Sequence, residues 1–150
     1  MLKVGDKVPD FEVMDEEGKR FSSKKLIGKK TILFFYPHDL TPTCILEACN
    51  FRDHFSLWKK KGFQIIGVNA DDPKKHQRFI SRYELPYKLL ADTERKVIDL
   101  FGVWGPKKFM GRDIIGIYRT TFIINKEGII THLIEKVKSK QHTEQILELL

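Results

Sequence analysis

The stretch from residue 31 to residue 53, TILFFYPHDLTPTCILEACNFRD, constrains the fold more than any other part of the chain. It opens with a short, aromatic and mostly apolar run over residues 31–36, which is typical of a strand buried on both faces. After a break at residues 37–40, Thr41 stands where a helix N-cap is expected. Pro42 suits the first helical position, because its missing N–H would have no partner there. The stretch therefore predicts a buried strand followed at once by a helix.

One cysteine falls in the first turn of this helix. Cys44 begins a stripe of apolar side chains at helical spacing, namely Ala48, Phe51, Phe55 and Trp58. First-turn N–H groups have no partner inside a helix, and the helix dipole favours negative charge there. A thiol in this position loses its proton more readily, and the thiolate is the nucleophilic form. Position alone leaves two interpretations open, a reactive thiol or the small buried hydrophobe that a free cysteine usually is.

Strand-like and helix-like segments alternate along the rest of the chain. Gly62 ends the first helix, and Asp72 caps a second helix that has Pro73 at its first position. Such alternation is typical of βαβ units and predicts a parallel sheet. We expect helices over about residues 42–61, 73–83, 94–101 and 142–150, and strands over about residues 31–36, 63–68, 87–90, 120–124 and 129–134.

Two further segments complete the expected architecture. Residues 11–21 alternate like two short strands around a turn, which predicts a β-hairpin. Residues 102–116 are rich in glycine, and we expect a loop with a small hairpin that extends from the core. The whole chain, residues 1–150, is expected to form a single α/β domain with a mixed sheet covered on both faces by helices.

The region around Cys44 resembles a known family. Pro37, Thr41 and Cys44 fit the pattern Pro-x-x-x-Thr-x-x-Cys, which is the signature of the peroxiredoxins. The longer string PHDLTPTCILEACNFRD is similar to the bacterioferritin-comigratory or Q-type subfamily. Further similar segments, such as LPYKLLADTERKV and GIYRTTFIINKEG, extend the resemblance over nearly the whole chain. The resemblance implies a thioredoxin-like three-layer fold to which the N-terminal β-hairpin is added.

The bulk composition excludes other classes of protein. The formal net charge is +7, but the lysines come in scattered pairs and triples, without a stripe of interleaved aromatic residues or a nucleic-acid motif. We interpret them as solvated faces and expect no nucleic-acid partner. No apolar run approaches the roughly 20 residues of a membrane span, so no membrane partner is expected. The N-terminus lacks the apolar core of a signal peptide, which predicts a cytoplasmic protein whose two cysteines are reactive rather than structural.

The residues around Cys44 suit peroxide chemistry. A thiolate that attacks the weak O–O bond gives a sulfenic acid plus water or an alcohol, so the expected substrates are hydrogen peroxide and organic hydroperoxides. The Thr41 hydroxyl can lie beside the sulfur, Pro37 can shield it from bulk water, and the N–H groups of Thr43 and Cys44 can donate to a peroxide oxygen. This chemistry requires no haem, flavin or metal, and we expect no cofactor.

Three other residues complete the expected site. The resemblance selects Arg119 as the cation that stabilises negative charge, although an arginine there can also form a surface ion pair. Glu47, one turn after Cys44, can hold a hydrogen-bond network near the site or merely favour the helix start. Thr43 departs from the family, in which glycine is common just before the reactive cysteine. A β-branched residue there narrows the approach to the sulfur and stiffens the helix start.

Cys49 is the expected resolving thiol, which attacks the sulfenic acid to form a disulfide. Five residues along an ideal helix give about 7.5 Å of rise and turn the side chains roughly 140° apart. A disulfide needs Cα atoms closer than about 7 Å, so the first two helical turns must unwind. Thioredoxin or a similar dithiol protein would then reduce the disulfide. This internal partner favours a monomer, whereas the alternative is that Cys49 is a passive apolar helix residue.

Competing functions remain open at this point. His38, Cys44, Cys49 and His54 cluster in the sequence, but their spacing matches no common zinc site, and no metal is expected. A thioredoxin-like protein-disulfide oxidoreductase without peroxidase activity is the main alternative, although the chain lacks the Cys-x-x-Cys motif that such proteins use. A non-enzymatic binding module on the same fold is the third.

Overall fold

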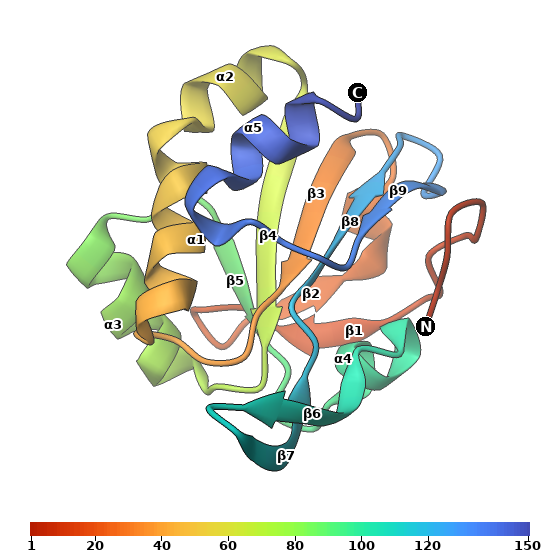
Figure 1. Ribbon diagram of the computed structural model, residues 1–150. Helices are drawn as coiled ribbons and strands as arrows, with labels where there is room; N and C mark the ends of the chain where they lie inside the picture. Colours follow the sequence, from red (N-terminus) through yellow and green to blue (C-terminus); the bar gives the residue numbers. More distant parts are fainter.

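The computed structural model describes all 150 residues and has a seven-stranded mixed sheet at its centre (Figure 1). The strands of this sheet are β1 (Glu12–Met14), β2 (Arg20–Ser22), β3 (Lys30–Phe35), β4 (Phe63–Asn69), β5 (Lys88–Ala91), β8 (Thr120–Ile124) and β9 (Ile130–Ile134). They lie side by side in the order β2-β1-β5-β4-β3-β8-β9. β3, β4 and β5 run parallel, as the alternation predicts, whereas the outer strands pair antiparallel.

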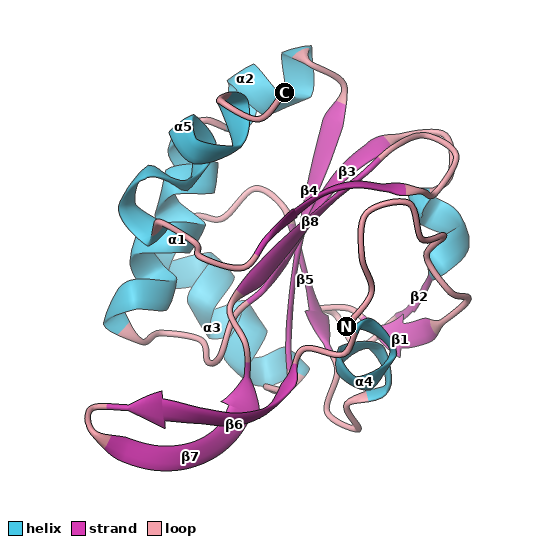
Figure 2. Ribbon diagram, turned by 45° about the vertical axis from the view of Figure 1, so that its right-hand side comes forward, coloured by secondary structure: helices cyan, strands magenta, loops and turns pink.

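Helices cover both faces of the sheet, which gives the expected three layers (Figure 2). One face carries α1 (Pro42–Asp53), α2 (Phe55–Lys60), α3 (Pro73–Tyr83) and α5 (His142–Leu147), which follows the short 3₁₀ helix η2 (Ser139–Gln141). The other face carries α4 (Lys96–Phe101) and the 3₁₀ helix η1 (Ser23–Leu26). None of these helices is long and apolar enough to cross a membrane.

β3 is the strand at which two hydrophobic cores meet. Ile32 and Phe34 point into the core beneath α1, whereas Leu33 and Phe35 point into the core beneath α4. Successive side chains of a strand face opposite sides, so a strand buried on both sides needs an unbroken apolar run. The end of β3 leads directly into the loop that precedes α1, and the core therefore fixes where that helix begins.

The helix expected over residues 42–61 is two helices, which corrects the sequence prediction. α1 ends at Asp53 and α2 begins at Phe55, with His54 between them at φ −108° and ψ 15°. The backbone N–H and ring Nδ1 of His54 lie 3.2 and 2.8 Å from the same carbonyl, that of Asn50. A side chain that takes up a helical acceptor in this way interrupts the regular ladder.

The C-terminal helix is also shorter than expected. α5 ends at Leu147, and Leu150 lies beyond it with 53% of its surface exposed. Ile146 is the residue of α5 that is buried in the α1 core. The last residues have no core to pack against, so they do not extend the amphipathic face.

A two-stranded hairpin stands apart from the central sheet, where the sequence predicts an extending loop with a small hairpin (Figure 2). β6 (Trp104–Phe109) and β7 (Arg112–Ile117) pair antiparallel along their whole length. The connecting residues Met110 and Gly111 both have positive φ angles, 52° and 79°, as two-residue hairpin turns require. The hairpin leads into β8 and thereby lies beside the start of α1.

Candidate active site

Cys44 lies in the first turn of α1 and is 1% exposed. Thr41 occupies the N-cap position and Pro42 the first helical position, as the sequence predicts. The first helical hydrogen bond runs from the Ile45 N–H to the Thr41 carbonyl at 2.9 Å. The N–H groups of Thr43 and Cys44 therefore have no backbone acceptor and remain available to an anion at the helix start.

The Thr41 side chain does not take the position that the sequence analysis gives it. Its hydroxyl donates to the His38 carbonyl at 3.2 Å, so it neither caps the helix nor contacts the Cys44 sulfur. Pro37 is half-buried in the same loop, and Thr43 is exposed in the first turn. Pro37, Thr41 and Thr43 are thus close to Cys44 in the sequence, but none of their side chains hydrogen-bonds to its sulfur.

Arg119 reaches the sulfur from a distant part of the sequence. It stands just before β8, and β8 pairs with β3 so that Thr120 lies opposite Phe35, close to the loop that precedes α1. The Arg119 Nη2 donates to Cys44 Sγ at 3.3 Å, and Nη1 donates to Glu47 Oε1 at 2.7 Å. The planar guanidinium thus bridges a sulfur and a carboxylate that lie one helical turn apart. The sulfur is thus in direct contact with a cation.

Glu47 is fully buried beneath this guanidinium. Burial raises its pKa to about 7, although the charge of Arg119 and the hydrogen bond from it lower the pKa in part. Its second oxygen, Oε2, has no hydrogen-bond partner and lies 3.7 Å from His142 Nε2. Glu47 therefore holds Arg119 with one oxygen and faces a buried imidazole with the other.

His142 is a residue of this site that the sequence analysis missed. Burial lowers its pKa to about 4, with Gln145 raising and Arg119 lowering the value. Its Nδ1 lies 2.9 Å from Gln145 Oε1, and its Nε2 lies 2.7 Å from the Thr121 hydroxyl. Because Gln145 Oε1 accepts a hydrogen bond, the neutral ring carries its proton on Nδ1 and accepts from Thr121. Only the packing of α5 against α1 brings His142 here, and no local sequence signal indicates it.

A second cation approaches the site from the β6–β7 hairpin. Lys107 donates from Nζ to the Ile117 carbonyl and is partly buried. Burial lowers its pKa, the positive charge of Arg119 lowers it further, and the negative charge of a Cys44 thiolate opposes both effects. The sequence analysis did not single out Lys107, because its place beside Arg119 depends on how the hairpin folds back.

Cys49 lies in the same helix, is half-buried and forms no disulfide. Burial raises the pKa of its thiol, Arg52 lowers that pKa, and Asp53 raises it. Because α1 is continuous from Pro42 to Asp53, the side chains of Cys44 and Cys49 point away from each other. The structure brings Cys44, Arg119 and Glu47 together, and it keeps Cys49 apart from them.

The cluster of cysteines and histidines around residues 38–54 does not converge. The His38 ring lies 3.7 Å from Asp71, and the His54 ring lies 3.2 Å from Glu144. No group of three histidine, cysteine, aspartate or glutamate side chains in the structure is arranged to hold a metal ion.

Comparisons with known proteins show the family to which the chain belongs. The model of the AhpC/TSA family matches residues 4–133. A Haemophilus influenzae protein that carries the name peroxiredoxin bcp is 41% identical over 99% of this chain and 96% of its own length. Peroxiredoxin Bcp of Escherichia coli is 36% identical, with the same coverage. The crystal structure of peroxidoxin BcpB from Mycobacterium tuberculosis superposes with a TM-score of 0.86 at 30% identity, and covers 99% of this chain and 96% of that one.

These findings establish the class of the protein. The thioredoxin-like fold, the family match over most of the chain and the peroxiredoxin relatives together show a thiol-dependent peroxidase. The chain belongs to the AhpC/TSA family and is similar to its Bcp and Q-type peroxiredoxins. Its activity is the reduction of peroxides at the expense of a thiol reductant.

Proposed function

We propose that Cys44 is the residue that attacks the peroxide. Its thiolate attacks the terminal oxygen of hydrogen peroxide or an alkyl hydroperoxide, and the O–O bond breaks so that the other oxygen is the leaving group. The sulfur gains one oxygen and becomes a sulfenic acid, while the leaving oxygen takes a proton and departs as water or an alcohol. The sulfur is oxidised and the peroxide is reduced, and no cofactor takes part.

The contact of Arg119 with the sulfur is the observation that carries this proposal. One nitrogen of the guanidinium lies 3.3 Å from Cys44 Sγ while the other is held by Glu47. A cation fixed in this way stabilises negative charge first on the sulfur and then on the departing oxygen, without having to reorient during the reaction. Glu47 is the positioning residue that keeps the guanidinium in place.

The loop and the helix start provide the other contacts to the substrate. The free N–H groups of Thr43 and Cys44 are donors for a peroxide oxygen, as at other anion sites of helix N-termini. Pro37 limits the access of water to the sulfur. The Thr41 hydroxyl donates to the His38 carbonyl in the unliganded site, so a bond to peroxide requires a rotation about its side-chain torsion. Thr43 narrows the entrance for bulky hydroperoxides.

Cys49 resolves the sulfenic acid. Its thiol sulfur attacks the Cys44 sulfur, the S–S bond forms, and the oxygen leaves as water with the thiol proton. The helix must unwind over its first turns before the two sulfur atoms can meet. Unwinding also exposes Cys49, which removes the burial that raises the pKa of its thiol and makes it a better nucleophile.

A dithiol protein such as thioredoxin then reduces the disulfide by exchange and returns the helix to its starting form. The chain acts as one domain over residues 1–150, and the internal resolving thiol lets a monomer complete the cycle. Neither a nucleic acid nor a membrane takes part.

A coupled assay with peroxide, thioredoxin and thioredoxin reductase tests this cycle. We expect Cys44→Ser to abolish turnover, and Cys49→Ser to consume one equivalent of peroxide without thioredoxin-dependent turnover. Mass spectrometry after one equivalent of peroxide should show the intact wild-type chain lighter by two hydrogens. A stable sulfenic acid in the wild type would contradict the role of Cys49, and full activity of Cys44→Ser would contradict the whole cycle.

A further inference from the structure

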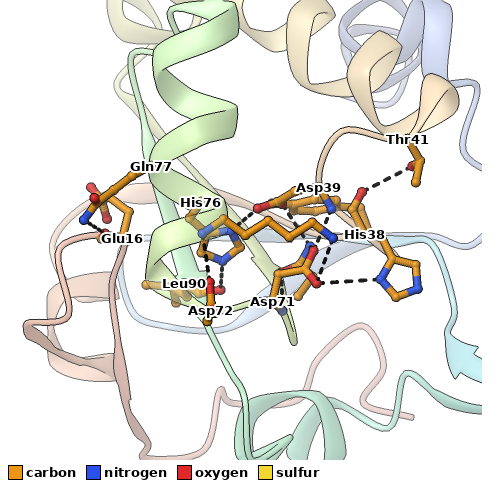
Figure 3. Close-up of polar contacts among 12 residues, drawn as sticks. Glu16, His38, Asp39, Thr41, Asp71, Asp72, His76, Gln77 and Leu90 are labelled. Atoms are coloured by element: carbon orange, nitrogen blue, oxygen red, sulfur yellow. Dashed lines mark hydrogen bonds and ion pairs between the residues drawn. The ribbon is translucent and has the colours of Figure 1, made fainter.

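A buried polar cluster that the proposed cycle does not use lies beside the loop before α1 (Figure 3). Asp39 is 2% exposed and His76 of α3 is fully buried. The His76 Nδ1 lies 2.5 Å from Asp39 Oδ2. The other carboxylate oxygen, Oδ1, accepts from the Tyr36 hydroxyl at 2.6 Å and from Asn69 Nδ2 at 3.0 Å. Both carboxylate oxygens of Asp39 therefore have buried hydrogen-bond partners.

The second ring nitrogen of His76 is bound as well. Its Nε2 donates to the Leu90 carbonyl at 2.9 Å, because a carbonyl can only accept. Burial lowers the pKa of His76, but the hydrogen bond and the charge of Asp39 raise it to above the ordinary value. When both groups are charged, Nδ1 donates to Oδ2, because a carboxylate can only accept. A buried ion pair is weak evidence for stability, so we consider its effect on the conformation of the loop.

The pair fixes the loop that carries the active-site residues. Asp39 stands between Pro37 and Thr41, and its own N–H donates to Asp71 Oδ2 at 2.7 Å (Figure 3). Leu40, the next residue, has a positive φ of 63°, a conformation that non-glycine residues adopt only when their surroundings impose it. At Asp39 the loop is thus tied to the end of β4 and to α3, and through His76 to β5.

A second fixed point lies at the far end of the segment that the cycle unwinds. The Asn50 Oδ1 accepts from the Thr143 N–H at 2.8 Å, and its Nδ2 donates to the Lys140 carbonyl at 3.1 Å. Cys44 and Cys49 both lie between Asp39 and Asn50. The chain can therefore rearrange between two anchors whose partners belong to other elements.

We propose that Asp39 and His76 form a positioning pair that keeps Pro37 and Thr41 in place around Cys44 while the first turns of α1 unwind and refold. The pair touches neither the sulfur nor the peroxide, and it acts through the loop. In this proposal, the hydrogen bonds of the pair hold the loop, and its charge is not needed. This inference rests on the proposed Cys44–Cys49 disulfide.

Two substitutions of one residue separate shape from charge. Asp39→Asn keeps every contact, because the new amide oxygen accepts from Tyr36 and Asn69 while the amide nitrogen donates to a neutral His76 ring. Asp39→Ala removes all of these side-chain hydrogen bonds and leaves the backbone N–H bond to Asp71. Rapid mixing with peroxide, followed by quenching and mass spectrometry, measures sulfenic acid formation and disulfide formation as separate rates. For Asp39→Ala we expect sulfenic acid formation to slow by about tenfold or more, because the loop is misplaced, with disulfide formation not slowed. Asp39→Asn should stay within about threefold of the wild type in both steps.

Control variants distinguish positioning from general loss of stability. Asp92 is also buried and caps α4 on the opposite face of the sheet, so Asp92→Ala should lower the free energy of unfolding and leave both rates unchanged. If Asp39→Ala does not fold, His76→Phe keeps the bulk of the ring without its hydrogen bonds and should show the same selective loss.

The possible outcomes separate this inference from the proposed cycle. An unaffected first step in folded Asp39→Ala or His76→Phe overturns the positioning role. An equal loss in Asp39→Asn, or in both steps, also overturns it. Absence of a Cys44–Cys49 disulfide in the wild type contradicts the proposed cycle itself, whatever the variants do.

Discussion

Glu47 and His142 are two titratable side chains that the fold buries side by side, with their pKa values shifted in opposite directions. The pKa of Glu47 is raised to about 7 from an ordinary 4.5, and that of His142 is lowered to about 4 from an ordinary 6.5. Burial is the main cause of both shifts, since it disfavours the charged form of either group. The two groups therefore make opposite contributions to the pH dependence of stability.

The two single variants should show slopes of opposite sign. Between about pH 4.5 and 7, folded Glu47 keeps a proton that the unfolded chain releases, so its contribution to the free energy of unfolding falls as pH rises, by up to about 3 kcal/mol. Between about pH 4 and 6.5, folded His142 lacks a proton that the unfolded chain binds, so its contribution rises with pH. Relative to the wild type, the free energy of unfolding of Glu47→Gln should therefore rise from pH 4.5 to 6.5, and that of His142→Gln should fall.

Urea unfolding at several pH values measures these slopes. Glu148→Gln, an exposed change just beyond the helix that carries His142, serves as the control and should follow the wild type. Slopes of the same sign in the two variants, each taken relative to the wild type, would show that the two pKa shifts do not have opposite directions.

Arg119 should contribute to catalysis through the direction of its donors as well as its charge. Arg119→Ala should slow the reaction of Cys44 with peroxide by about 100-fold or more, the usual cost of one preorganised donor at a site of developing charge. Arg119→Lys keeps the charge but cannot bridge Cys44 and Glu47, so an intermediate rate is expected. Stopped-flow rates at neutral pH check this, with Arg112→Ala on the exposed hairpin as a control. Equal rates for the alanine variant and the wild type would remove the proposed role.

At the scale of elements, α1 combines a stable body with a weakly held beginning. Its N-cap residue makes no side-chain cap hydrogen bond, and the helix ends where His54 takes up the Asn50 carbonyl. A helix start without a cap side chain is less stable by roughly 1 kcal/mol than a capped one. This is the region that the proposed cycle requires to open.

Amide hydrogen exchange on the reduced and the disulfide form tests whether it opens. Within residues 43–50, the amides from Ile45 onward, which are hydrogen-bonded in the helix, should lose protection in the disulfide form, because the Cys44–Cys49 bond is incompatible with the helix. Residues 73–83 of α3 should keep theirs. Unchanged protection over residues 43–50 would refute the unwinding.

Thr43 should set how readily the helix start opens and which peroxides enter. Its side chain is exposed, so Thr43→Gly leaves the packing intact while it lowers helix stability by less than about 1 kcal/mol. Disulfide formation should therefore speed up by at most about fivefold, and bulky hydroperoxides should gain more in rate than hydrogen peroxide. Ser56→Gly in α2, an exposed site outside the unwinding segment, is the control. A slower disulfide step in Thr43→Gly would contradict this expectation.

At the scale of the whole molecule, the core beneath α1 leaves no room for added atoms in the central sheet. A Cβ on Gly67 of β4 would lie 2.7 Å from the Leu89 side chain and 2.9 Å from the ring of Phe34. Gly67→Ala should therefore lower the free energy of unfolding by about 1–3 kcal/mol. Gly116→Ala meets only the flexible Lys107 side chain and should be nearly neutral. Urea unfolding of both variants measures the difference. Equal free energies of unfolding for Gly67→Ala and Gly116→Ala would show that the side chains around Gly67 can move to make room for the added methyl group.

The sequence predicted what local signals encode. The strand over residues 120–124 and the starts of α1 and α3 at Pro42 and Pro73 agree with the structure, because apolar runs, caps and prolines act within a few residues. The break at His54 was missed, since a side chain competing for a backbone carbonyl leaves no periodic signal.

The site was predictable only in part, for a related reason. The place of Cys44 in a helix start follows from local signals and its role from the family motif, whereas Arg119 came from the family resemblance alone. Lys107 and His142 were missed, because only tertiary packing brings the hairpin and the last helix to the site. Residues that come to a site from distant segments have no fixed spacing in the sequence, so no local pattern reveals them.

The separation of Cys44 and Arg119 by 75 positions has a consequence during synthesis. A growing chain that has emerged only as far as its first helix lacks the guanidinium that we propose as the partner of the Cys44 sulfur, since Arg119 has yet to be made. In the proposed mechanism, the Cys44 sulfur therefore gains its full reactivity only after β8 has been translated and has paired with β3.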